Sequence, residues 1–192
     1  MANEGQAAII SEDQHKQMLA YLAKGRHSSR NKAIYLLGYR AGLRVGSIAG
    51  LTLKDVLSED GSIKTRVVAR RAIMKGSKTS TFYLNHPELQ EALVEWISER
   101  PKSSRVDNLF VSQKGFAFAP NVLSHTIQKW FKKVGLEDCS SHSLRRSMAT
   151  NVIKSGADIV ALKTLLNHSN IQTTQRYVTH NDDYLMDVVG NL

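Results

Sequence analysis

Apolar residues recur every three to four positions over much of the chain, which is the spacing of amphipathic helices. A first helix is predicted over residues 11–25, where Ser11 and Gln14 form a capping-box pattern and Gly25 ends the apolar rhythm. Further helices are predicted over residues 30–42, 45–51, 87–100, 120–135, 141–156 and 158–168, and several of them begin at a proline or end at a glycine.

The middle of the chain has a different pattern. Residues 62–84 are rich in β-branched side chains around a Lys-Gly-Ser-Lys turn, which predicts two strands joined as a hairpin. Residues 108–112 fit a brief strand or an extended loop. Because the strands cluster in one place instead of alternating with helices, we expect an α+β fold, mainly helical with a small antiparallel sheet.

Residues 166–180, "LNHSNIQTTQRYVTH", contain a histidine and a tyrosine nine positions apart. On one continuous helix, nine steps of about 100° would place His168 and Tyr177 on opposite faces. Asn167, Ser169 and Asn170 suit helix ends and N-caps, so the sequence predicts a break between the two residues. Such a turn would let both side chains reach one pocket.

Charge and composition narrow the class of partner. The 192 residues include 26 Lys and Arg against 17 Asp and Glu, which gives a formal net charge of +9 and a pI of about 9.7. This excess favours a polyanionic partner, nucleic acid first. The lone Cys139 excludes an intramolecular disulfide, and neither a leader pattern nor an apolar run near the roughly 20 residues of a membrane span is present. We expect a soluble intracellular protein with one domain over residues 1–192.

Three stretches carry candidate chemistry. His142 and Arg145 are three residues apart and would share one face of their predicted helix. Arg44 follows a Gly-Leu turn between apolar residues that should bury its stem, so its guanidinium would need an anionic partner. Lys75 lies at the expected hairpin tip, with Lys78 as its rival. Each stretch taken alone is more typical of a structural or solvated residue than of a site.

Together, these stretches resemble the tyrosine recombinase (phage integrase) family. Their order carries the resemblance: Gly-Leu-Arg at 42–44, a hairpin lysine at 75, His-x-x-Arg at 142–145, Leu-x-His at 166–168, and a tyrosine nine residues after that histidine. Five stretches in one order are hard to produce by chance, and the resemblance covers residues 11–187. It implies the tyrosine recombinase catalytic-domain fold and a site-specific DNA recombinase of integrase or invertase type.

The resemblance also implies a role for each matching residue. Tyr177 would form a covalent 3′-phosphotyrosyl link to DNA, and rejoining would need no cofactor because the bond energy stays in that link. Arg44, Arg145 and His168 would hold the phosphate, Lys75 would protonate the departing 5′-oxygen, and His142 would assist proton transfer. Fixed guanidinium groups neutralise a phosphodiester in transfer without a metal. A tyrosine of ordinary pKa, about 10, needs such a cationic setting or a nearby base to attack at neutral pH.

The chain departs from the family pattern in two ways. The family commonly has an acidic residue three positions after the first arginine, where this chain has Ser47, which can accept a hydrogen bond from Arg44 but carries no charge. Relatives usually carry a separate N-terminal core-binding domain, and we expect it to be absent here because only residues 1–10, expected to be flexible, precede the first helix. In such relatives the N-terminal domain completes a clamp around the duplex. Its loss should weaken DNA binding, whether the chain is a compact invertase or a fragment.

The expected partners are double-stranded DNA and further copies of the chain, up to a tetramer on DNA, with accessory proteins unknown. In the tail, residues 182–192, an apolar stripe would pack either on a neighbouring protomer or on its own domain: Tyr184, Leu185, Val188 and Val189. A second group is expected to contact the DNA backbone, although each member alone fits a solvated face: Arg70, Arg71, Lys78, Lys129, Lys132 and Lys133.

Three other interpretations stay open. One is a metal site made from Cys139, His142, His168 and His180, although the nearby Arg145 would repel a cation. Another is a recombinase-like protein that binds DNA or a partner recombinase without cutting, which Ser47 favours. The last is a type IB topoisomerase, which would share the chemistry. His15, His27, His86 and His125 lie in unrelated segments and receive no role. We expect a cytoplasmic, nucleoid-associated protein of bacterial or phage origin.

Overall fold

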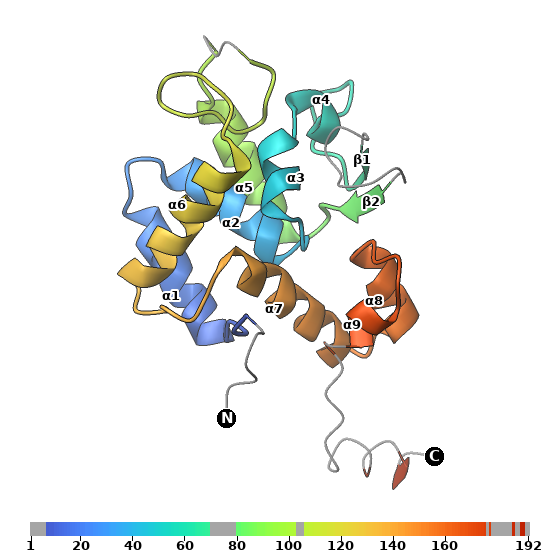
Figure 1. The fold of residues 1–192 in the computed structure, drawn as a ribbon. Helices are drawn as coiled ribbons and strands as arrows, with labels where there is room; N and C mark the ends of the chain where they lie inside the picture. The colour runs from blue at the N-terminus through green and yellow to red at the C-terminus, as the bar shows by residue number, and fades with distance from the viewer. Residues whose placement is uncertain are drawn as a thin grey trace. The chain divides into compact units, whose positions relative to one another are not determined.

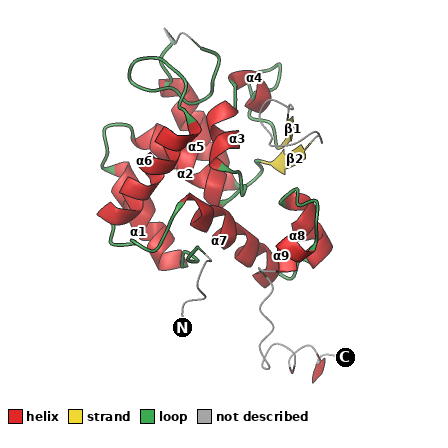
Figure 2. Cartoon of the chain, viewed as in Figure 1, coloured by secondary structure: helices red, strands yellow, loops and turns green. Residues whose placement is uncertain are grey.

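The chain folds into two compact parts, Met1–Met148 and Ala149–Leu192. The structure is a computed structural model that describes residues 7–69, 80–102, 106–175, 177, 186, 189 and 190 (Figure 1). Helices dominate both parts, and two strands form a small antiparallel sheet in the first (Figure 2). The predicted fold class is therefore confirmed.

The helices lie close to where the sequence predicts them. Those of the first part are α1 (Glu12–Ala23), α2 (Ser28–Tyr39), α3 (Val45–Gly50), α4 (Leu53–Val56), α5 (Pro87–Glu99), α6 (Pro120–Lys133) and the start of α7 (Ser141–Lys154). The second part holds the rest of α7, α8 (Ile159–Leu165) and α9 (Gln172–Gln175). The short α4 was missed, although Thr52 and Asp55 form its capping box.

Local signals set most helix ends. The Ser11 side chain accepts a hydrogen bond from Gln14 N, and the Gln14 side chain accepts one from Ser11 N, so the predicted capping box at α1 is confirmed. Helix α1 ends at Ala23, two residues before Gly25. Pro87 opens α5 as predicted, because its missing N–H costs nothing in a first turn.

Helix α2 is the centre of the first part, packed against α1, α3 and α5 (Figure 1). Nine of its twelve residues are buried, so it has no broad polar face. One close approach depends on Gly38: a Cβ there would lie 2.6 Å from Leu144 Cδ1 and 3.0 Å from Leu144 Cβ. The glycine therefore lets the first turns of α7 pack tightly on α2, which fixes the start of α7.

The predicted strands form β1 (Arg66–Ala69) and β2 (Ser80–Tyr83), paired antiparallel with Val67 opposite Phe82. Both of these side chains are buried, which ties the hairpin to the core. The predicted hairpin turn lies outside the described residues. Residues 108–112 form isolated bridges, Asn108 with Thr52 and Val111 with Ala117, so the expectation of a brief strand or extended loop is confirmed.

The second part turns where the sequence predicts a break. Asp158 caps α8, because its Oδ1 accepts hydrogen bonds of 2.7 Å from Val160 N and Ala161 N. After α8 the chain reverses at Asn167, whose φ is +50°, a conformation that asparagine tolerates better than most residues. Helix α9 then begins at Gln172. Within the described ranges, no helix is long and apolar enough to span a membrane.

Candidate functional site

Arg44 lies on the surface, at the N-cap of α3. The expectation that its apolar neighbours would bury its stem is wrong. Leu43 before it is only 6% exposed and Ile48 after it is fully buried, so these side chains fill the core themselves and leave the arginine outside. An exposed guanidinium needs no protein carboxylate to offset burial, and it is accessible to an anion from solution.

Arg145, in contrast, is buried and is tied to the loop that precedes Arg44. Its Nη1 donates a 2.5 Å hydrogen bond to Gly42 O. Gly42 has φ +65°, a left-handed conformation that turns the chain from α2 toward α3. The structure therefore links both predicted arginines through one short segment, residues 42–44, which we call the arginine loop.

His142 and Arg145 both lie on α7, as predicted, but in different surroundings. His142 is exposed in the first turn, where its backbone N donates to Ser140 Oγ at 3.3 Å, whereas Arg145 is 9% exposed. The pair therefore spans the border between the buried face of α7 and its surface. Such a border is where an imidazole can reach a ligand held by a buried arginine.

Ser47, at the position where the resemblance implies an acidic residue, is buried at 6% exposure. Lys75, Lys78, Arg70 and Arg71 lie outside the described residues. The three α6 lysines are exposed, because the opposite side of α6 supplies Leu123, Ile127 and Phe131 to the core: Lys129, Lys132 and Lys133. They form a basic surface at the end of that helix.

In the second part, the helix break brings His168 and Tyr177 together. Their rings are stacked, with centroids 6.1 Å apart and an interplanar angle of 15°. Thr174 joins the pair, because its Oγ1 lies 2.9 Å from His168 Nδ1 and its carbonyl accepts a 3.0 Å hydrogen bond from Tyr177 N. Thr174 is fully buried. Because the rings of His168 and Tyr177 are in contact, the prediction that the break lets the two residues meet is confirmed.

Thr174 is a residue that sequence reasoning missed. Its only signal was its place between His168 and Tyr177, among several other polar residues of the turn. Because a hydroxyl can donate or accept, Thr174 couples the imidazole tautomer to its own rotamer. The buried Thr174 hydroxyl therefore helps to orient the His168 ring.

Two of the residues considered for a metal site, Cys139 and His142, lie in surroundings that do not suit a metal ion. Burial raises the pKa of the Cys139 thiol, and a protonated thiol is a poor metal ligand. His142 is exposed while Cys139 is buried, and His180 lies outside the described residues. The described part of the chain contains no group of three or more His, Cys, Asp or Glu side chains able to hold a metal ion.

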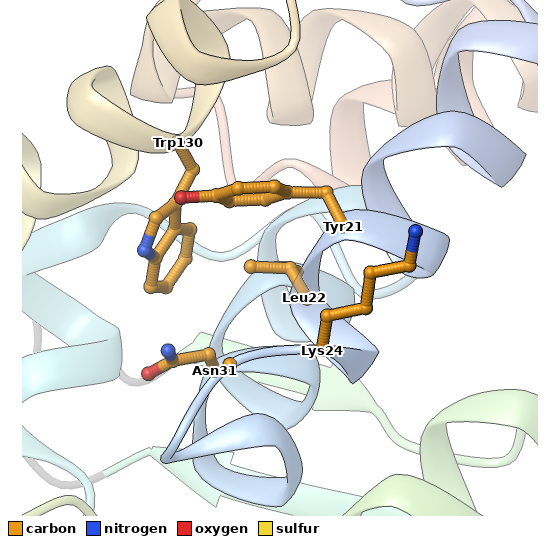
Figure 3. A pocket seen from close by; sticks show the side chains of 6 residues that line it. Tyr21, Leu22, Lys24, Asn31 and Trp130 are labelled. Carbon is orange, nitrogen blue, oxygen red and sulfur yellow. The ribbon is translucent and has the colours of Figure 1, made fainter.

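A cavity of about 230 Å³ lies elsewhere in the first part, between α1, the start of α2 and α6 (Figure 3). Tyr21 and Trp130 frame it, and Leu22, Lys24, Gly25 and Asn31 complete its lining. None of the predicted site residues lines this cavity. The described candidate site residues therefore lie outside the lining of this cavity. They are found in the arginine loop, on α6 and α7, and in the segment around α9 that contains His168 and Tyr177.

Comparison with known proteins agrees with the sequence patterns. The family model described as the phage integrase family matches residues 8–183. The chain is 33% identical over 181 residues to tyrosine recombinase XerC of Actinobacillus succinogenes and 34% identical over 182 residues to that of Haemophilus influenzae. These matches cover 93% and 92% of this chain, but only 59% and 58% of those recombinases. The chain thus spans about three fifths of their length.

Solved structures show the same fold. The crystal structure of XerA recombinase matches with a TM-score of 0.80 at 26% identity, covering 98% of this chain and 66% of that chain. A Tn1549 transposon integrase in complex with circular intermediate DNA matches with a TM-score of 0.81 at 16% identity, covering 100% of this chain and 69% of that chain. At that low identity the second match supports the fold alone.

Proposed function

The chain belongs to the phage integrase family, and from that premise we propose that it is a site-specific tyrosine recombinase that cuts and rejoins double-stranded DNA. The Tyr177 hydroxyl oxygen attacks a backbone phosphorus and gives up its proton to a base, a transfer that His142 is proposed to assist. The phosphotyrosyl bond forms while the bond to the 5′-oxygen breaks. The leaving oxygen takes the electron pair of that bond and a proton, for which Lys75 is the proposed donor. Rejoining reverses these steps.

The observation that carries this proposal is the pairing of His168 with Tyr177 across the helix break. A tyrosine used only for packing needs no imidazole beside it and no buried hydroxyl that orients the imidazole. Here the stacked rings and the Thr174 link hold both groups in one small turn. When the Tyr177 hydroxyl lies next to the phosphorus, the His168 imidazole also lies close to the phosphate. We expect it to contact a non-bridging oxygen there.

Arg44 and Arg145 are the proposed phosphate grip. His168 is proposed to share that work, and His142 is proposed to assist proton transfer. Arg145 is held rigidly by its bond to Gly42, and rigid donors stabilise a transition state without reorganising. Arg44 is exposed at the N-cap of α3, where DNA can reach it. The α6 lysines Lys129, Lys132 and Lys133 are proposed to contact the DNA backbone outside the reacting phosphate.

Assembly of several copies on DNA is a further part of the proposal. Of the apolar tail stripe, Tyr184, Leu185 and Val188 lie outside the described residues, whereas Val189 is 69% exposed. Met186, also in the tail, is 64% exposed. Exposed apolar side chains at a chain end suit a partner protomer.

A second candidate function is DNA binding without cleavage. The observation that favours it is Ser47, a neutral buried residue where the family commonly has an acidic one beside the first arginine. Without that charge the Arg44 guanidinium loses one means of orientation. A protein of this kind would bind DNA or a partner recombinase and form no covalent intermediate.

A suicide-substrate assay separates the two functions. Nicked duplexes drawn from DNA that flanks the gene are incubated with the wild type, Tyr177→Phe and Tyr83→Phe, and denaturing gels are scanned for a protein–DNA adduct. Tyr83 is an exposed tyrosine of β2, so its variant controls for loss of any surface hydroxyl. We expect an adduct with the wild type and Tyr83→Phe and none with Tyr177→Phe. DNA binding without any adduct would favour the second function.

A further inference from the structure

Three ionisable side chains meet where α1 and α5 flank α2: one of them, His15, is buried, and the other two are partly exposed. His15 comes from α1, Arg40 directly follows α2, and Glu88 lies in the first turn of α5. We call them the His15 cluster. His15 is only 1% exposed, and its ring stacks on that of Tyr39, with centroids 4.1 Å apart and an angle of 9°. Nothing in the reaction proposed above uses these residues.

The cluster is joined by short polar contacts. Arg40 Nε donates to Glu88 Oε2 at 2.8 Å, and Arg40 Nη2 lies 3.1 Å from His15 Nε2. The same His15 nitrogen lies 3.3 Å from Glu88 Oε1, while His15 Nδ1 lies 3.1 Å from the Tyr35 hydroxyl. His15 Nε2 therefore has a donor and an acceptor as neighbours.

Nε2 can serve only one of these neighbours at a time. Unprotonated, it accepts a hydrogen bond from Arg40, with Nδ1–H left to donate to Tyr35. In the protonated ring, Nε2–H donates to Glu88, Arg40 loses an acceptor, and two positive charges lie side by side. Gain of one proton thus removes His15 as a partner of Arg40 and leaves Glu88 as the partner that holds it.

The surroundings favour the neutral ring. Burial is the main cause that lowers the pKa of His15, and Arg40 lowers it further, while Glu88 and Glu12 oppose the shift. Although part-burial acts to raise the pKa of Glu88, its hydrogen bond from Arg40 and the charges of His15 and Arg40 lower it overall. Glu88 therefore stays ionised as the fixed partner of Arg40, and within the His15 cluster His15 is the group that titrates. His86, the N-cap of α5, is a second histidine nearby; burial lowers its pKa, and Arg40 lowers it further while Glu88 raises it.

Arg40 lies two residues before the carbonyl that anchors Arg145. Its backbone N donates to Leu36 O at 2.7 Å and ends α2, and Leu43 N returns to Leu37 O at 3.0 Å. Between these two bonds the chain makes the turn at Gly42. A displacement of the Arg40 backbone would therefore move the arginine loop, and with it Gly42 O and Arg44.

We propose that Arg40, held by Glu88 and His15, is a positioning residue for the arginine loop, and that protonation of His15 releases one of its two holds. Its effect on catalysis rests on the proposed recombinase function, whereas the coupling between His15 and the loop does not. In mild acid the loop loosens, and the hold of Arg44 and Arg145 on a phosphate weakens. When His15 loses its proton again, Arg40 regains its second partner and the hold of Arg44 and Arg145 on the phosphate is restored.

NMR tests the coupling without DNA. The His15 ring, the Leu43 amide and the Arg145 Nε are followed from about pH 8 to about pH 5, a range that spans histidine titration. His15→Gln keeps a polar side chain beside Arg40 that takes up no proton. His27→Gln is the matched control, since His27 is a half-buried histidine at the other end of α2, its pKa also lowered by burial.

We expect the loop resonances to titrate with the His15 midpoint in the wild type and in His27→Gln, and to stay constant in His15→Gln. Glu88→Gln should lower the His15 midpoint, because the Glu88 charge stabilises the protonated ring. Loop resonances that stay constant while His15 titrates in the wild type would overturn the proposal. So would a loop titration that persists in His15→Gln.

The suicide-substrate assay tests the catalytic consequence. One pH unit below the His15 midpoint about a tenth of the molecules keep a neutral ring, so wild-type adduct formation should be slower than at neutral pH by up to about tenfold. His15→Gln should lack this loss. A wild type that forms no adduct at any pH contradicts the recombinase function alone, because the NMR result stands apart. A loss of the same size that persists in His15→Gln contradicts the positioning role.

Discussion

The two groups of candidate site residues, one in each part of the chain, are built in different ways. We call the group in Met1–Met148 the cationic half and the group in Ala149–Leu192 the tyrosine half. In Met1–Met148, the hydrogen bond from Arg145 to Gly42 joins residues 103 positions apart, and Ile10 N reaches Ser147 Oγ across 137 positions. In Ala149–Leu192, the contact between His168 and Thr174 joins residues six positions apart. The cationic half therefore depends on the global fold, and the tyrosine half depends on one local turn.

The burial of side chains follows the same division. The largest fully buried side chains belong to the first part, among them Tyr35, Tyr39, Phe110 and Phe131. In the described residues of the second part, the buried apolar side chains are Ala149, Leu162 and Leu166. Elements with little buried apolar surface open at lower free energy than the core. We infer that the nucleophile is carried by the more easily opened half and the phosphate grip by the more stable one.

The strongest test of this comparison replaces the two arginines of the grip in turn. Arg44→Ala and Arg145→Ala should each slow adduct formation by at least about 100-fold, because each removes a donor to the transition state. Only Arg145→Ala should also lower the free energy of unfolding, by about 1–3 kcal/mol, since Gly42 O loses its donor. Denaturant unfolding curves measure the change in stability, and the adduct assay measures the change in rate, so the two effects can be separated. Equal melts for both variants would contradict the structural role of Arg145.

A second test changes the packing of α7 on α2 without replacing a candidate site residue. Gly38→Ala places a methyl group against Leu144 and should cost about 1–3 kcal/mol of unfolding free energy, as overpacked cores do. Gly46→Ala is the control, because its Cβ would meet nothing within 4 Å in helix α3, and it should be neutral or slightly stabilising. Thermal melts compare the two variants. If Gly38→Ala melts like the wild type, α7 can move away from α2 at little cost. That result would contradict the rigid placement of Arg145, which lies on α7.

Local chemistry explains what the sequence predicted well. The Ser11 capping box, Pro87 at the start of α5 and the break before Tyr177 each depend on residues a few positions apart. Side-chain hydrogen bonds and fixed backbone angles act at that range. The same reason explains why the pairing of His168 with Tyr177 could be expected from fifteen residues of sequence.

What the sequence did not predict depends on distant partners. The exposure of Arg44 follows from how Leu43 and Ile48 fill the core, and the bond of Arg145 to Gly42 needs α7 to pack on α2. His15 had no recognisable pattern, because its partners Arg40 and Glu88 lie 25 and 73 positions away. No periodicity or motif within one helix reports such contacts.

The smallest expected effect probes the local half. Thr174→Val keeps the shape of the buried side chain but removes the hydroxyl that meets His168 Nδ1, while Thr173→Val alters an exposed neighbour on the same short helix. Loss of one hydrogen bond of about 1 kcal/mol should slow adduct formation by about fivefold in Thr174→Val only. Hydrogen exchange should quicken in α8 and α9 and stay unchanged in α2 and α5. If α2 and α5 also exchange faster, the tyrosine half shares the stability of the core, and the division between a globally built grip and a locally built nucleophile fails.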